Sequence, residues 1–419
     1  MKLKKYINTV VQLLVLITLL NCSSDDDSSE PNLAPESFDL LTVTNNTADV
    51  TVLPVFTWNT STDPDGDMVT YDFIIDTNAN PTTIIASDLT ETFFVTTSRF
   101  NTSKTYFWKV IAKDGNGGQT ESEIFTFSTK GLRIERLTNN TAFSARMRHT
   151  SVVFNDKVWV IGGRDVTGKL NDVWNSDDGI TWNDVTSSNQ FTKRENHASV
   201  VFNNKIWVIG GLDSNGILKN DIWNSDDGIT WSEVTNNAPF SFRVAHTATV
   251  FNNKIWIIGG TAGMGGTFND VWSSSDGINW TEENSNASFS PLFDHTVSVF
   301  NNKMWLVFGI EIWNSDDGVL WTEVVNPTPL LHRTKHTSVV FDDAIFLIAG
   351  YNGGAFLNDI QKSEDGVNWE TIVNTTNNGL LFSRRADHTS IVHNSQLLII
   401  GGKVSSGGNT FLNDVFAIE

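Results

Sequence analysis

The sequence predicts an all-β protein in which a β-sandwich precedes a ring of six four-stranded units. The 419-residue chain suits two or three domains. It contains 15 Trp, 27 Phe and 30 Gly but 4 Tyr, which is typical of many short, aromatic-rich strands separated by turns. After residue 130, one motif recurs six times. A motif repeated at this period indicates supersecondary units that pack against their neighbours.

Composition and charge exclude several classes of protein. Hydrophobic residues make up 39% of the chain and charged residues 18%, which fits neither an acidic disordered protein nor a coiled coil. The 28 basic and 48 acidic residues give a net charge of −20, which argues against a nucleic acid partner because phosphates repel it. The single Cys excludes a disulfide within the monomer and any site with two thiolates.

The N-terminus has the pattern of an export signal. Basic residues precede an apolar run, residues 10–20, that is too short to span a bilayer. The run ends in Leu-Leu-Asn-Cys22, which resembles a bacterial lipobox, and the acidic segment 23–27 resembles the surface-export signal of Bacteroidetes lipoproteins. The resemblance implies a signal peptide over 1–22, a lipid on Cys22, and an outer-membrane lipoprotein exposed at the cell surface. The alternative is an ordinary signal peptide with an incidental Cys.

A polar tether and a small sandwich are expected next. Residues 23–34 are polar and have no apolar periodicity, so we expect a flexible tether. Residues 35–130 contain short alternating strands, with a Trp on an early strand, 55–58, and an aromatic run on a later one, 105–110. This pattern resembles a fibronectin type III domain, which implies a role as a spacer.

One turn of the sandwich is a candidate calcium site. Asp63, Asp65 and Asp67 alternate as carboxylates do in calcium loops. No Glu follows at the spacing that would close such a loop, and Pro-Asp-Gly is also common in ordinary turns. Both interpretations stay open.

Residues 131–419 carry the repeat. Each unit has a His followed by a β-rich run, an Asn/Asp turn, a second strand that ends at a Gly pair or a variant of it, and then an Asn-Asp-Val/Ile-Trp element or a relative of it. Five units add a Ser-Asp-Asp-Gly-x-x-Trp element or a relative. The repeat resembles the kelch repeat of β-propellers, and its last element resembles the structural Asp-box turn. The repeated His residues are His149, His197, His246, His295, His336 and His388.

Closure of the ring also follows from the pattern. The sixth unit stops at its third strand, Asn413 to Phe416, and the segment that resembles a fourth strand lies near residue 134. We therefore expect an N-terminal strand to complete the last blade of a six-bladed propeller, which leaves no free sheet edge in the ring.

Variation between repeats indicates where a ligand could bind. The residue before each repeat His should lie at the channel mouth, and its variety suits a polar ligand. The candidates there are Arg148, Asn196, Asp294, Lys335 and Asp387, with Tyr351 on a nearby loop. The fourth unit lacks the loop between its second and third strands, so we expect a notch beside Phe293 and Phe308. The alternative is that the fourth unit binds no ligand and lost this loop by neutral sequence change.

Three functions stay open. The first is a non-catalytic platform that binds a glycan or a protein and is held off the membrane by the sandwich. The second is a metal-independent sugar mutarotase, because the repeats resemble six-bladed kelch sialic acid mutarotases. The third is an adhesion scaffold. We expect no cofactor: copper oxidases with this fold need a Cys joined to a Tyr, and the only Cys is the anchor. Six equivalent His around a channel should lie too far apart to hold one metal.

Overall fold

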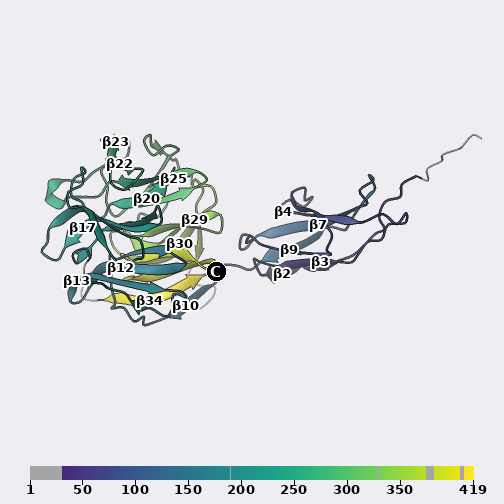
Figure 1. Cartoon of the computed structure of the whole chain (residues 1–419), viewed down its shortest axis with the longest axis horizontal. Helices are drawn as coiled ribbons and strands as arrows, with labels where there is room; N and C mark the ends of the chain where they lie inside the picture. The colour runs from purple at the N-terminus through teal and green to yellow at the C-terminus, as the bar shows by residue number, and fades with distance from the viewer. Residues whose placement is uncertain (1–30, 189, 328–329, 374–381, 406–409) are drawn as a thin grey trace, which may run out of the picture. The chain divides into compact units, whose positions relative to one another are not determined.

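The computed structural model describes residues 31–188, 190–327, 330–373, 382–405 and 410–419 (Figure 1). The predicted signal peptide with Cys22 and most of the predicted tether lie outside these residues. Contacts divide the chain into two units: the first comprises 1–47, 55–95 and 106–127, and the second comprises 48–54, 96–105 and 128–419. Among the described residues, no helix is long and apolar enough to cross a membrane.

The N-terminal region is a sandwich of two sheets around an aromatic core. One sheet has the order β1 (Leu40–Thr42), β3 (Val55–Trp58) and β6 (Phe93–Val95). The other has the order β2 (Thr47–Val50), β9 (Phe125–Thr129), β7 (Thr105–Lys113), β4 (Thr70–Asp76) and β5 (Ile84–Leu89), with β8 (Gln119–Glu121) on β7. Phe56 of β3 contacts Phe73 and Trp108 of the other sheet, with ring centroids 4.8 and 4.9 Å apart. All three side chains are fully buried.

The described part of the repeat region forms six four-stranded units. The first two units are β11 (Thr150–Phe154), β12 (Lys157–Asp165), β13 (Gly168–Ser176) and β14 (Asn183–Asp184), then β16 (Ala198–Phe202), β17 (Lys205–Asp213), β18 (Leu218–Ser225) and β19 (Ser232–Thr235). β15 (Arg194–Glu195) pairs with strands of both. The third unit is β20 (Thr247–Phe251), β21 (Lys254–Ile258), η1 (Gly263–Gly265), β22 (Val271–Ser274) and β23 (Thr281–Asn284).

The remaining units follow the same order. The fourth is β24 (Thr296–Phe300), β25 (Lys303–Phe308), β26 (Glu311–Ser315) and β27 (Thr322–Glu323), and the fifth is β28 (Thr337–Phe341), β29 (Ala344–Tyr351), β30 (Phe356–Ser363) and β31 (Glu370–Val373). The sixth is β32 (Thr389–His393), β33 (Gln396–Lys403) and β34 (Phe411–Ile418), and β10 (Ile134–Thr138) completes it.

The ring closes through the strand that the sequence predicts. β10 pairs antiparallel with β34, with Ile134 opposite Ile418, and the two strands lie side by side in Figure 1. The first strands of the units contact one another in turn, and β32 of the sixth unit contacts β11 of the first. The repeat units therefore form a closed ring around one axis.

Glycines let neighbouring units approach closely. A Cβ on Gly228 would lie 2.3 Å from the indole of Trp159, which belongs to the preceding unit, and Gly277 stands in the same relation to Trp207. These glycines have positive φ, so another residue would be strained as well as crowded. The Trp residues of the second strands are therefore packing residues between units.

In most units, a buried ion pair ties the segment that precedes the first strand to the third strand or to the residue just before it. In the second unit, the Arg194 guanidinium is fully buried and donates hydrogen bonds to both carboxylate oxygens of Asp221, at 2.8 and 2.7 Å, and to the Gly210 carbonyl at 2.8 Å. The same pairs are Arg146–Asp172, Arg243–Asp270, Arg333–Asp359 and Arg385–Asp414. The fourth unit has Leu292 and Glu311 at these positions, so both partners of the pair are replaced together.

Candidate functional site

A closed ring of backbone hydrogen bonds surrounds the axis at one face. It is formed by the residues that precede the repeat His: Arg148, Asn196, Ala245, Asp294, Lys335 and Asp387. Each donates its backbone N–H to the carbonyl of the ring residue in the preceding unit, at 2.9 to 3.2 Å. All six have positive φ, between 52° and 59°. We call these six residues the axial ring.

The axial ring and the repeat His line a hollow of about 140 Å³. Four of the repeat His, namely His149, His197, His246 and His295, also line a second hollow of about 260 Å³, whose other lining residues are mostly Ser and Thr of the first strands. The His layer thus separates a charged mouth from a channel lined by hydroxyl groups.

The repeat His are buried and neutral. Burial lowers the pKa of His149, His197 and His295 to about 3 and that of the other three well below the usual value. Five of them have Nε2 within 3.0 to 3.2 Å of a Thr hydroxyl of the preceding unit. The exception is His246: the preceding unit has Ala198, and neither ring nitrogen has a hydrogen-bond partner among the described residues. The His layer is therefore mainly structural.

Charged side chains form a network around the mouth. The Asp387 carboxylate lies 3.0 Å from Lys403 Nζ and 3.6 Å from Arg148 Nε. Burial alone would lower the pKa of Arg148, but the carboxylates of Asp387, Glu195 and Asp294 raise it. Counting Arg148, Arg164, Lys169, Lys335 and Lys403 against Glu195, Asp294 and Asp387, the network has five cations and three carboxyl groups. The mouth is thus locally basic on an acidic protein.

Asp294 is the carboxyl of this network that lies farthest from a cation. Its side chain is 13% exposed, and the nearest cation, Lys335 Nζ, lies 3.8 Å away. Within the described residues its carboxyl group accepts no hydrogen bond. Burial, together with the nearby Asp387 carboxylate, raises the pKa of Asp294 to about 6, against the opposing effect of Lys335, Arg148 and Lys403. Asp294 can therefore take up or release a proton near neutral pH.

Comparison with known proteins agrees with this architecture. Residues 181–319 match the KLHDC2/KLHL20/DRC7 Kelch-repeats domain, and residues 89–225 match the DUF6242 beta propeller domain. The repeat region is a kelch-type β-propeller. The solved structure titled "Structure of YjhT" resembles it with a TM-score of 0.54 and 16% identity, over 67% of this chain and 96% of that one. At this identity the likeness concerns the fold alone. A comparison with curated proteins gives no match.

The propeller brings together five of the eight residues that the sequence suggested for ligand binding. Arg148, Asn196, Asp294, Lys335 and Asp387 line the axial hollow, as does the sixth ring residue, Ala245. Each comes from a different blade, and the ring closure of the fold places them around one mouth.

The other three suggested residues lie outside the lining of that hollow. Phe293 is 42% exposed, whereas Phe308 packs against the core between blades three and four. The Tyr351 hydroxyl donates a hydrogen bond to the Gly353 carbonyl at 2.7 Å. Blade four does have the short connection that was expected, because Phe308 pairs directly with Glu311.

Sequence reasoning missed four members of the network. Arg164 and Lys403 both stand directly after the Gly pair of their blades, and Lys169 is opposite Arg164 on the next strand. Glu195 is the only acidic residue found two positions before a repeat His. Arg164 and Lys403 could have been found by comparing the repeats directly after the Gly pair, and Glu195 by comparing them two positions before the His.

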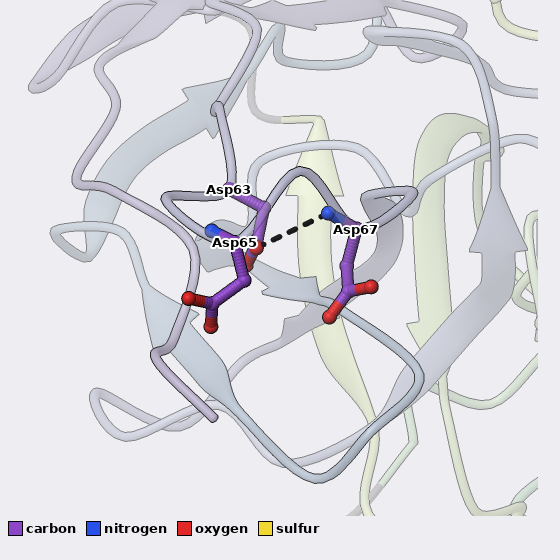
Figure 2. A group of neighbouring side chains, drawn as sticks. All are labelled: Asp63, Asp65 and Asp67. Carbon is purple, nitrogen blue, oxygen red and sulfur yellow. Dashed lines mark hydrogen bonds between the residues drawn. The ribbon is translucent and has the colours of Figure 1, made fainter. Parts of the chain in front are cut away.

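The candidate calcium residues of the sandwich lie in one turn (Figure 2). Asp63, Asp65 and Asp67 each offer an oxygen within 4.8 Å of the others. Asp63 Oδ1 accepts the backbone N–H groups of Asp65 and Asp67, at 2.9 and 3.2 Å, and Asp67 Oδ2 accepts a hydrogen bond from Asn116 at 2.8 Å. These bonds are those of an Asx turn, so the cluster has a structural explanation without a metal, and the calcium site stays a prediction.

Proposed function

We propose that the propeller is a ligand-binding platform that receives the polar end of a glycan at the axial mouth. The observation that carries this proposal is the Asp294 carboxyl group, which lines the hollow without a hydrogen-bond partner among the described residues. A buried polar group in this state is stabilised by a ligand that supplies the missing hydrogen bond.

The lining of the mouth favours a sugar over an apolar ligand. Asn196 offers an amide, Lys335 and Arg148 offer charged donors, and Asp294 offers a carboxyl, all around one hollow. Sugar hydroxyls donate and accept hydrogen bonds, so they can satisfy this mixture of groups. The hollow is small, about 140 Å³, and suits one terminal group of a larger molecule.

A glycan array probed with the full-length protein tests this proposal. We expect bound glycans whose signal falls at least about tenfold in Asp294→Asn, since Asn cannot replace a carboxylate acceptor. Asp343→Asn is the matched control, because Asp343 is exposed in a hairpin turn where three other blades have Asn. Equal glycan binding by Asp294→Asn and Asp343→Asn would show that Asp294 is not part of the binding site. An empty array together with recovery of one protein in a pull-down would favour the adhesion scaffold.

Acid–base catalysis is a second candidate, favoured by two carboxyl groups in different surroundings. The pKa of Asp294 is raised to about 6, whereas Asp387 forms ion pairs with Lys403 and Arg148. A proton-holding carboxyl beside a paired carboxylate suits a general acid and a general base, which sugar mutarotation requires. NMR exchange between the anomers of sialic acid tests it. Acceleration by the wild type that is lost in Asp294→Asn would support catalysis, and an unchanged rate would exclude it for this sugar.

We place the protein at the outer-membrane surface, anchored through a lipid on Cys22 with the sandwich as a spacer. The lipobox-like sequence supports this proposal. In membrane fractionation, we expect the wild type in the membrane pellet and Cys22→Ser in the soluble fraction. Retention of the variant in the pellet would contradict lipid anchoring.

A further inference from the structure

Blade one carries an unusual pair of like charges. Arg164 and Lys169 stand directly opposite each other on β12 and β13. The same register position holds Leu212 and Leu218 in blade two, and Tyr351 and Phe356 in blade five. Like charges directly opposite on a sheet are destabilising, whereas apolar pairs are stabilising. Blade six has one cation there, Lys403 opposite Phe411, so the two cations of blade one depart from the pairs of all three of these blades, at a cost in stability.

The pair belongs to a cluster with an excess of positive charge. Glu195 is 1% exposed, and its carboxylate lies 3.3 Å from Arg148, 3.4 Å from Arg164 and 3.7 Å from Lys169. One carboxylate cannot neutralise three cations, and the Asp387 carboxylate near Arg148 is shared with Lys403, so the cluster keeps an excess of positive charge. The Arg164 side chain is 43% exposed and that of Arg148 25% exposed, so both side chains are partly open to solvent.

Arg148 connects this cluster to the axial mouth. It lines the hollow, and it also bonds Glu195 through Nη1. Its Nη2 makes no hydrogen bond to any part of the chain that the structure describes. A guanidinium with a free Nη2 group and a second guanidinium nearby is suited to a planar or tetrahedral anion.

We infer that Arg148, Arg164 and Lys169 bind an anionic group of the ligand, held in place by Glu195. This inference rests on the proposed function of the axial mouth and specifies the charge of the ligand. Carboxylate and phosphate groups share the required chemistry. The anion supplies the negative charge that Glu195 alone does not, which relieves the repulsion between Arg164 and Lys169.

Isothermal titration calorimetry with the full-length protein tests this inference. Glucuronate, glucose 6-phosphate and glucose serve as probes, so that the sugar ring is kept while its charge changes. We expect one or both anionic sugars to bind at least about tenfold more tightly than glucose, and more weakly as ionic strength rises. Preference for glucuronate would identify a carboxylate, and preference for glucose 6-phosphate a phosphate.

The decisive variant is Arg164→Leu/Lys169→Leu, which installs the residues of blade two at the same register. We expect it to fold, since Glu195 keeps Arg148 as a partner, and to lose at least about tenfold in affinity for the anionic sugar. Arg164→Gln, at an exposed position, tests the same contact with less change in packing. Unchanged affinity in both variants would overturn the inference.

The inference and the proposed function fail in different ways. If glycans bind and Asp294→Asn weakens them while the charge of the sugar has no effect, the axial site stands and the anion subsite is wrong. If anionic sugars bind and the Leu double variant weakens them while Asp294→Asn has no effect, the subsite stands and the role of Asp294 is wrong. If none of the probes and no arrayed glycan binds, both are wrong.

Discussion

At the scale of single residues, two neighbouring positions of the repeat have separate tasks. The His is the same in all six blades, is buried and neutral, and in five of them bonds a Thr on the first strand of the preceding blade. The residue before it keeps a positive φ in every blade, yet its side chain varies from Arg to Ala to Asp. The backbone at this position therefore serves the ring, and its side chain is free to serve a ligand.

Ala198→Thr should stabilise the propeller. It supplies the hydroxyl that five blades have and that His246 lacks, which is worth about 0.5–1.5 kcal/mol for a typical hydrogen bond. The free energy of unfolding in urea measures the effect. Thr247→Ala is the reciprocal control, since it removes the partner of His295 and should destabilise the fold. A loss of stability in Ala198→Thr would mean that the added methyl group does not fit.

At the scale of the blade, a buried ion pair links strands that are far apart in sequence. Arg194 and Asp221 are 27 residues apart, and the Trp223 indole also donates to Asp221, at 3.0 Å. Blade four shows that a blade forms without this pair when both partners are replaced, with Leu292 fully buried in place of the Arg. Removing one partner alone leaves an unpaired buried charge.

Arg194→Leu should therefore destabilise the propeller by about 3–5 kcal/mol, because the Asp221 carboxylate stays buried without its partner. The double variant Arg194→Leu/Asp221→Asn should recover part of this loss. Urea unfolding of the wild type, both single variants and the double variant gives the coupling free energy. Additive effects of the two changes would show that the pair is not energetically coupled.

At the scale of the whole molecule, six buried His make stability depend on pH. The unfolded His bind protons below pH about 6.5. In the native protein His149, His197 and His295 stay neutral down to pH about 3, and the pKa of each of the other three is also well below the usual value, so stability falls as the pH falls below about 6.5. Asp294 acts in the opposite direction: its raised pKa means that native protein binds more protons between pH 3.8 and about 6. One Asp opposes six His, so acid should destabilise the protein.

Urea unfolding at pH 7.5, 6.5 and 5.5 checks this pH dependence. At the acid end of this range, the free energy of unfolding should fall by up to about 1.4 kcal/mol per pH unit for each His that stays neutral in the native protein. His388→Asn should remove the contribution of one proton, about 1.4 kcal/mol per pH unit, from this pH dependence. Asp343→Asn, at an exposed turn, should leave the pH dependence unchanged. A stability that is flat over this range would mean that the native His become protonated.

Much of the fold could be predicted because its signals are local. Asn and Asp turns, Gly pairs and alternating strands recur at fixed positions, and the incomplete sixth unit indicated that a segment near Ile134 completes the ring. The axial ring could also be predicted, since the position before each His follows from the repeat. Some strand ends differ from the prediction by a few residues. The strand expected over 105–110 extends to Lys113, because pairing with the neighbouring strand sets where a strand ends.

The charge network could be predicted only in part. Glu195 reaches Arg148, Arg164 and Lys169 because β15 pairs with strands of two blades, a contact that no single repeat contains. The notch residue Phe308 was expected near a ligand, yet it packs against the core between blades three and four.

The sequence by itself determined the repeat, the all-β architecture and the strand that closes the ring, since these depend on side-chain patterns within one blade. Only the tertiary structure decided which charges meet. Asp294 and Asp387 are 93 residues apart in sequence, and burial, together with the repulsion between these two carboxylates, raises the pKa of Asp294. Burial and electrostatic interaction depend on distance in space, which ring closure sets and the sequence of one blade does not contain.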